Sequence, residues 1–93
     1  MAYKVEIRPA ALEFIQKLSP KHQRQIRSKI DTLESNPRPA NAEQLRGYSN
    51  FWRIRSGDYR ILYTIQDQIL LITVVTAGNR GDIYDRLRRM LDR

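Results

Sequence analysis

Cysteine is absent from this sequence of 93 residues, and histidine occurs once, at His22. Without cysteine the chain can form no disulfide, no thiolate metal site and no cysteine nucleophile. The single histidine lies at a polar helix start and has no constellation of serine and aspartate around it, so we expect no hydrolytic triad. The chemistry of the chain must rest on other residue types.

Long hydrophobic runs are absent as well. The longest one, ILLITVVTA at residues 69–77, has the length of a strand and covers about half of what a bilayer span needs. The first residues, MAYKVEI, lack the apolar core of a signal peptide, so we expect a cytoplasmic protein. The length suits one modest core, which predicts a single domain over residues 1–93. Asp82 and Asp85 lack the spacing and companions of a metal site, and we expect neither metal nor cofactor.

Positive charge is abundant and unevenly divided. Seventeen Lys and Arg stand against ten Asp and Glu, a formal net charge of +7 that suits a polyanionic partner such as nucleic acid. The four lysines all lie in the first third, and every basic residue after Lys29 is arginine. Arginine offers a planar fork that matches phosphate in a bidentate way. The pattern predicts a phosphate-facing surface in the C-terminal two thirds, unless it is only compositional drift toward arginine.

The hydrophobic periodicity predicts an α+β fold. Proline at positions 9 and 20 suits helix starts, Ser19 suits a cap, and residues 38–43 form a proline-broken connector. We expect an N-terminal strand, a helical hairpin, an antiparallel four-stranded meander with a turn near Asp67, and a short C-terminal helix. The predicted ranges are 3–7 for the first strand, 9–18 and 20–35 for the hairpin, 44–48, 51–56, 59–66 and 69–77 for the meander, and 82–91 for the last helix.

The stretch FWRIRSGDYR at residues 51–60 predicts a tight hairpin. Gly-Asp in a two-residue turn favours type II′, which would pair Ser56 with Tyr59 and place Arg55 opposite Arg60. Two like charges that face each other cost roughly 0.2–1 kcal/mol, so the arrangement suggests that an anion binds there. Alternation divides the hairpin into a face toward the helices and an opposite face; the first carries Trp52, Ile54, Ile61 and Tyr63, and the second Arg53, Arg55, Arg60 and Leu62.

The C-terminal segment adds a second polar feature. Arg80, Tyr84 and Arg88 follow one another at steps of four. If the last helix begins early, they form one polar ridge along it.

Three motifs together carry a family resemblance: LRG at 45–47, WRIRSGDYRILY at 52–63 and GNRGDIYDRL at 78–87. With the order of predicted elements, the chain resembles the RelE/ParE toxin superfamily of bacterial and archaeal toxin–antitoxin systems over nearly its whole length. The resemblance implies a RelE-like fold. It also implies an acidic, RelB-like antitoxin as partner.

The RelE branch further implies a ribosome-dependent, metal-independent mRNA endonuclease that inhibits translation. In such enzymes a ribose 2′-oxygen attacks the adjacent phosphorus in the ribosomal A site. Residue by residue, the resemblance places the catalytic positions on Arg53, Arg55, Arg60, Arg80 and Tyr84, with Arg46 and Arg88 as further RNA contacts. The first two of these positions are lysines in the best-studied members.

That departure affects the mechanism. With a pKa of about 13, an arginine is neutral in about one molecule in a million at neutral pH, so neither Arg53 nor Arg55 is a convincing general base. We expect electrostatic roles for them. Tyr84 can orient the hydroxyl, stack on a base or accept the proton. Each residue also has a structural alternative: an ion pair of Arg60 with Asp58 or Glu43, solvation of a helix by Arg80 and Arg88, or packing by Tyr84.

Two other classes of function remain open from the sequence. One is a ParE-type protein that inhibits gyrase without nuclease chemistry. The other is a basic RNA- or DNA-binding module without toxicity, whose affinity would depend steeply on salt.

Overall fold

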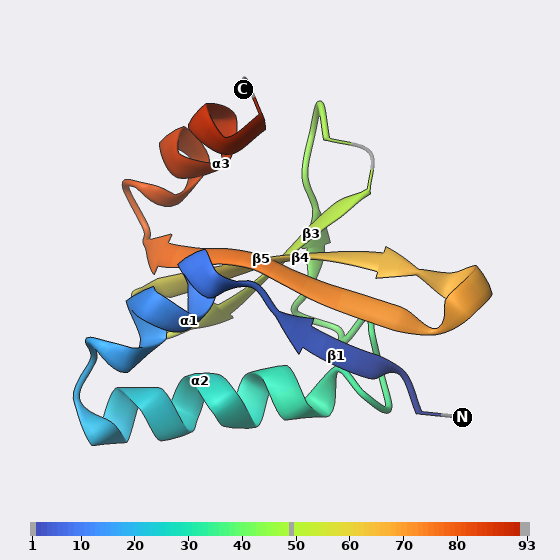
Figure 1. Ribbon diagram of the computed structural model, residues 1–93, viewed down its shortest axis with the longest axis horizontal. Coiled ribbons are helices and arrows are strands. Elements are labelled where there is room, and N and C mark those ends of the chain that lie inside the picture. Colours follow the sequence, from blue (N-terminus) through green and yellow to red (C-terminus); the bar gives the residue numbers. More distant parts are fainter. Residues whose placement is uncertain (1, 49, 92–93) are drawn as a thin grey trace.

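A computed structural model describes residues 2–48 and 50–91 of the chain and shows three α-helices against one sheet (Figure 1). None of these helices is long and apolar enough to cross a membrane. The elements in chain order are β1 (Lys4–Ile7), α1 (Pro9–Gln16), α2 (Pro20–Thr32), β2 (Glu43–Gln44), β3 (Phe51–Ser56), β4 (Tyr59–Gln66), a 3₁₀ turn η1 (Asp67–Ile69), β5 (Leu71–Asn79) and α3 (Ile83–Leu91).

The sheet has five strands in the order β1-β5-β4-β3-β2. Strands β2 to β5 form the predicted antiparallel meander. The observed sheet has one strand more than the predicted four, because β1 joins it parallel to β5, with Val5 opposite Ile72. This pairing joins segments far apart in the chain, and the alternation of a short strand does not specify its partner.

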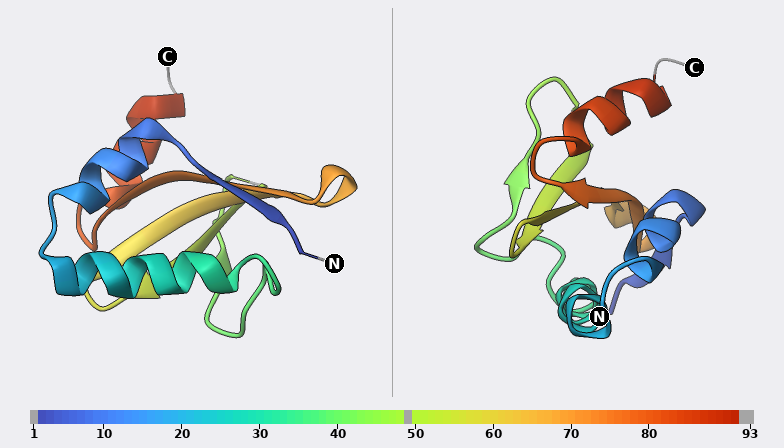
Figure 2. Two further views of the ribbon diagram at one scale, coloured as in Figure 1. Left: turned by 60° about the horizontal axis from the view of Figure 1, so that its bottom comes forward. Right: turned by 90° about the vertical axis from the view of Figure 1, so that its left-hand side faces the viewer.

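The sheet lies between two layers of helix. Helices α1 and α2 cover one face and α3 covers the other (Figures 1 and 2). The main core lies under α1 and α2 and contains Ile54, Ile61 and Tyr63, so the predicted helix-facing side of the hairpin is confirmed. Leu62 points the other way and packs with Ile83 and Leu87 of α3. Alternation along β4 therefore supplies both cores.

Helices α1 and α2 begin as predicted but end earlier, whereas α3 begins at Ile83, one residue after the predicted start, and ends at Leu91 as predicted. Pro9 and Pro20 stand in the first turns, and Ser19 caps α2 by accepting a hydrogen bond from the His22 backbone N–H at 3.5 Å. Helix α1 ends at Gln16 and α2 at Thr32, short of residues 18 and 35. At the first of these ends, the Gln23 amide donates to the carbonyls of Gln16 at 3.2 Å and Leu18 at 2.8 Å. That contact satisfies two carbonyls at the C-terminal end of α1, where carbonyl groups lack a partner inside the helix.

Two strand boundaries differ from the prediction. Strand β2 occupies Glu43–Gln44 instead of 44–48, because Gly47 adopts φ +81° and turns the chain away. Strand β5 begins at Leu71, after Leu70 closes the 3₁₀ turn with φ +52°, instead of at residue 69.

Strand β5 also runs past its predicted end at residue 77 to Asn79. Gly78 therefore does not break it but pairs with Arg60. A Cβ on Gly78 would lie 3.2 Å from Cδ1 of Ile83, so the missing side chain lets α3 approach the sheet.

A cluster of polar contacts joins three segments that are distant in the chain. Arg38 in the connector donates to both carboxylate oxygens of Asp67, at 3.3 and 2.8 Å, and the Tyr3 hydroxyl donates to the same carboxylate at 2.6 Å. The Arg38 guanidinium also lies over the Trp52 ring, 5.4 Å from its centroid. We refer to Tyr3, Arg38 and Asp67 as the clip, because they tie the N-terminal strand and the connector to the β4–β5 turn.

Candidate functional site

The β3–β4 hairpin sets the geometry of the candidate site. Gly57 has φ +60°, whereas Asp58 is not among the residues with positive φ, which is the combination of a type II′ turn. Ser56 pairs with Tyr59 and Arg55 with Arg60, so the predicted turn and register are confirmed. Both arginines therefore project from the same face of the sheet, the face that α3 partly covers. We name Arg53, Arg55, Arg60 and Arg80 the arginine face.

Arg60 lies at the centre of this face and is only 7% exposed. Its guanidinium donates to the backbone carbonyls of Gly57 at 3.3 Å and Tyr59 at 3.2 Å. Among the described residues no carboxylate forms an ion pair with it, so the alternative of a salt bridge to Asp58 or Glu43 is wrong.

The electrostatics of Arg60 reflect this isolation. Burial, followed by the charges of Arg55, Arg53 and Arg80, lowers the pKa of Arg60 below the ordinary value of arginine. An arginine remains charged at neutral pH even so. The face therefore concentrates positive charge that lacks an internal counterion at Arg60.

Arg53 is held differently. Its side chain is 12% exposed, and Nη2 forms an ion pair with the Glu43 carboxylate, which lies directly opposite on β2. The other terminal nitrogen, Nη1, donates to the Tyr84 hydroxyl at 2.9 Å. Nε of Arg53 is buried and has no hydrogen-bond partner. One guanidinium thus brings a carboxylate and a phenol together.

Tyr84 reaches the arginine face because α3 packs on the sheet. Ile83 and Leu87 of this helix are buried against Leu62. Tyr84 lies at the border between this buried side of the helix and solvent and is 36% exposed. Helix α3 begins at Ile83, so Arg80 lies in the preceding turn, where its N–H donates to the Asp58 carbonyl at 3.1 Å. The polar ridge of Arg80, Tyr84 and Arg88, which was predicted for a helix that begins earlier, therefore does not form.

The two predicted RNA contacts lie further out. Arg46 lines an open groove beside the face, together with Glu43, Gln44, Leu45, Tyr48 and Tyr84. Arg88 is exposed and forms an ion pair with Asp85 at 3.6 Å. The structure thus gathers Arg53, Arg55, Arg60, Arg80 and Tyr84 around one face, with Arg46 at its border, but turns Arg88 toward a carboxylate.

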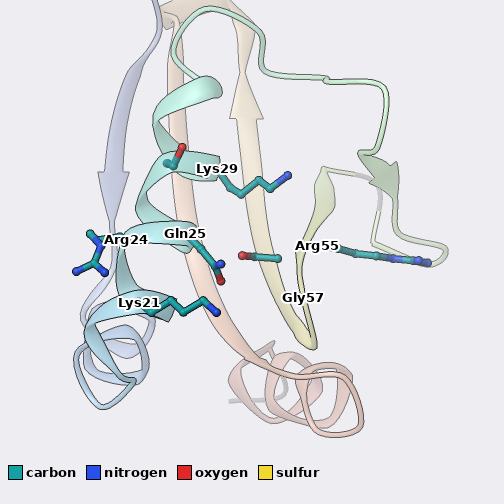
Figure 3. Close-up of a pocket in the computed structure, with 8 residues that line it drawn as sticks. Lys21, Arg24, Gln25, Lys29, Arg55 and Gly57 are labelled. Atoms are coloured by element: carbon teal, nitrogen blue, oxygen red, sulfur yellow. The ribbon is translucent and has the colours of Figure 1, made fainter.

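A second groove opens on the far side of the hairpin. Lys21, Gln25 and Lys29 of α2 line it opposite the end of β3, and Figure 3 shows these three side chains pointing toward the hairpin. The Arg55 side chain points away from this groove (Figure 3). The groove is basic and contains neither Arg53 nor Arg60, but Arg55 also lines it, so it adjoins the arginine face at that residue.

Within residues 2–48 and 50–91, no group of three or more histidine and acidic side chains is arranged to hold a metal ion. The site is built from arginines, one tyrosine and one carboxylate. The carboxylate, Glu43, is the residue at this site whose contact with Arg53 was not predicted from the sequence. The sequence signal for this contact is the pairing of residues 43 and 53 across neighbouring strands. The predicted strand at 44–48 began one residue too late to include Glu43.

Comparison with known proteins identifies the class. Residues 5–84 match the family described as the ParE toxin of the type II toxin–antitoxin system, parDE. A RelE-like toxin protein of Escherichia coli is 35% identical over 91% of this chain and 93% of its own length. The mRNA interferase toxin RelE of Escherichia coli K12 is 29% identical over 98% of this chain and 100% of its own length.

Solved structures agree with this class. The archaeal RelE in complex with RelB from Pyrococcus horikoshii superposes with a TM-score of 0.78 at 29% identity, covering 87% of this chain and 98% of that one. A free mutant form of Escherichia coli RelE gives 0.76 at 28% identity over 96% and 98% of the two chains. The chain belongs to the RelE/ParE superfamily of toxin–antitoxin toxins, and it is a RelE-type toxin.

Proposed function

We propose that this toxin is a ribosome-dependent, metal-independent mRNA endonuclease that inhibits translation by cutting messages in the ribosomal A site. The observation that carries the proposal is the arginine face: the nearly buried Arg60 has no carboxylate partner among the described residues, and Tyr84 lies 2.9 Å from Arg53 beside it. Such a surface suits a phosphate whose charge grows during reaction.

The arginines would act through charge. Attack of a ribose 2′-oxygen on the adjacent phosphorus builds a phosphorane-like state with extra negative charge on its oxygens. Arg55 and Arg60, paired across the hairpin, can donate to these oxygens, and Arg80 is placed beside them by its bond to Asp58. Removal of one such donor from comparable sites costs on the order of 10²–10³ in rate.

The dependence on ribosomes follows from the shape of the site. The groove next to the arginine face is lined by Tyr48, Tyr84 and a few polar side chains and is open rather than closed around a base. Such a surface can hold a backbone but supplies little readout of sequence. The ribosome would then position the message. That the target is mRNA is suggested by the name of the Escherichia coli relative, mRNA interferase toxin. This action takes place in the cytoplasm.

An acidic, RelB-like antitoxin would hold the toxin silent. The net charge of +7 suits an acidic partner, and the Pyrococcus horikoshii relative was solved as a complex of RelE with RelB. An antitoxin that covers the arginine face would block phosphate binding directly.

A second candidate is inhibition of gyrase without nuclease chemistry. It is favoured by the matching family description, which names a ParE toxin. In that case Arg60 and Tyr84 would be dispensable for toxicity, and DNA damage rather than loss of translation would follow expression.

The deciding experiment uses purified toxin, ribosomes and a message placed in the A site. We expect cleavage that yields a 2′,3′-cyclic phosphate or 3′-phosphate and a 5′-hydroxyl. A matched message with a single 2′-deoxyribose at the target nucleotide should resist cutting, because the attacking oxygen is missing. Cutting of the deoxy message, or no cutting of either message together with inhibited gyrase, would contradict the proposal.

A further inference from the structure

The nuclease reaction needs a group that takes the proton from the 2′-hydroxyl, and the arginine face cannot supply one. All four cations of the face are arginines, which stay protonated at neutral pH. The question rests on the proposed function, since only the 2′-hydroxyl attack requires this base.

Glu43 is the carboxylate that the structure places at the site. It lies opposite Arg53 in the β2–β3 register, and its carboxylate forms the ion pair with Nη2 of that arginine. The Tyr84 hydroxyl lies on Nη1 of the same guanidinium, so carboxylate and phenol are separated by a single planar group. The Glu43 side chain is nevertheless 64% exposed, which leaves a carboxylate oxygen accessible to a bound sugar.

The adjoining groove gives that sugar a place. Glu43 and Tyr84, which both contact Arg53, line it together with Arg46 and Tyr48. A phosphate on the arginine face would put the preceding ribose toward this groove, with Arg46 available for the next phosphate and the tyrosine rings for stacking on a base. Glu43 stands where the two regions meet.

We propose that Glu43 is the general base of this toxin. Its carboxylate accepts the proton of the ribose 2′-hydroxyl while the 2′-oxygen forms a bond to phosphorus and the bond from phosphorus to the 5′-oxygen breaks. The leaving 5′-oxygen takes a proton from water, and Glu43 later returns its own proton to water. The products are a 2′,3′-cyclic phosphate and a 5′-hydroxyl, with no oxidant, reductant or other reactant required.

Arg53 then has a positioning role that the resemblance alone does not assign. It holds the carboxylate on one side and the Tyr84 hydroxyl on the other, and its buried side chain keeps both in place. An arginine serves this purpose better than a lysine, because its fork can engage two groups at fixed angles.

An alternative role for Glu43 is to slow the cleavage reaction. If the carboxylate only occupies Arg53 and competes with the phosphate, its removal frees a cation and raises the cleavage rate. The two readings therefore differ in the sign of one measurement.

Single-turnover cleavage at saturating ribosomes tests this with Glu43→Gln, which keeps the shape and an acceptor oxygen but cannot take the proton. We expect a loss of on the order of 10²–10⁴ in rate with ribosome binding unchanged, and a melting temperature lowered by a few degrees at most, because the ion pair with Arg53 is lost. Glu43→Asp keeps a displaced carboxylate and should recover part of the rate. Glu13→Gln makes the same change at an exposed position of α1 and should leave the rate as in the wild type.

The pH–rate profile gives a readout that a structural role would not move. The wild type should lose activity toward acid as a carboxylate becomes protonated, and Glu43→Gln should lack this limb; the other groups facing Glu43 are Arg53, Arg46, Tyr48 and Tyr84. An unchanged or faster Glu43→Gln enzyme would overturn the assignment, as would a wild type without an acid limb. If the wild type fails to cut at all, it is the proposed function that falls.

Discussion

Arg38 and Arg60 show how the same side chain serves two purposes in one small protein. Arg38 is exposed, donates twice to Asp67, and its pKa is raised, chiefly by that hydrogen bond. Arg60 is buried, has no carboxylate partner among the described residues, and its pKa is lowered, chiefly by desolvation. The clip compensates its charge, whereas the arginine face leaves its central charge uncompensated.

The difference separates stability from function. A paired cation on the surface contributes modestly to folding, and a buried cation among like charges opposes it. Because the folded-state pKa of Arg60 is depressed, its destabilising effect is fully present at neutral pH and is relieved only as pH rises through that pKa. This loss of folding stability falls at the arginine face, where an external anion can compensate the charge of Arg60.

The largest expected effect is that of Arg60→Ala. We expect single-turnover cleavage to fall by on the order of 10² or more, because a donor to the reacting phosphate is lost. The melting temperature should stay the same or rise slightly, since a repulsive pair with Arg55 is removed. Thermal melts and ribosome cleavage on the same preparations measure both.

Arg38→Ala is the matched control for that experiment. It should melt at a lower temperature than the wild type and cut at the normal rate. An Arg60→Ala protein that is destabilised but fully active would show that the two arginines do not differ in the way described.

Arg60→Lys sharpens the comparison. The substitution keeps the charge but replaces the planar fork with a point charge, so we expect only a fraction of the wild-type rate, a loss of roughly tenfold. Full recovery would mean that net charge suffices on this face. The rate is measured as for Arg60→Ala, at saturating ribosomes so that binding differences do not enter.

Asp67→Asn addresses the clip and should have a smaller effect. It removes the charge that holds Arg38 and Tyr3, so the melting temperature should fall by a few degrees at most, in keeping with an exposed pair. Cleavage on ribosomes should not change, because the clip lies apart from the arginine face. A variant with normal melting and reduced cleavage would contradict this separation.

The smallest effect is the pH dependence of the clip. The hydrogen bonds from Arg38 and Tyr3 lower the pKa of Asp67 below its ordinary value of 3.8, so its contribution is present above pH 3.8 and is lost as pH falls through the folded-state pKa. The difference in melting temperature between wild type and Asp67→Asn should therefore shrink in strong acid. At the other limit, the pKa of Tyr3 is raised above its ordinary value of 10.0, chiefly by its bond to Asp67. Its contribution is therefore present below pH 10.0 and should be lost as pH rises through the raised folded-state pKa.

Much of the fold could be predicted because its signals are local. The hairpin register follows from Gly57-Asp58 and the alternation on either side, and Pro9, Ser19 and Pro20 mark the helix starts. Element ends were less predictable. Gly47 and Leu70 bend the chain through positive φ, although the sequence placed both inside predicted strands, and Gly78 continues a strand that it was expected to break.

The sequence by itself determined that Arg53, Arg55 and Arg60 of the hairpin share one face, because strand alternation and a two-residue turn are properties of neighbouring residues. Only the tertiary structure decided which of those arginines is compensated. Glu43 pairs with Arg53 and not with Arg60, Arg60 is buried, Tyr84 is held over the sheet by α3, and β1 closes the far edge beside β5. Each of these depends on contacts between segments distant in the chain, whose partners are selected by packing of the whole core and are not encoded in any one stretch.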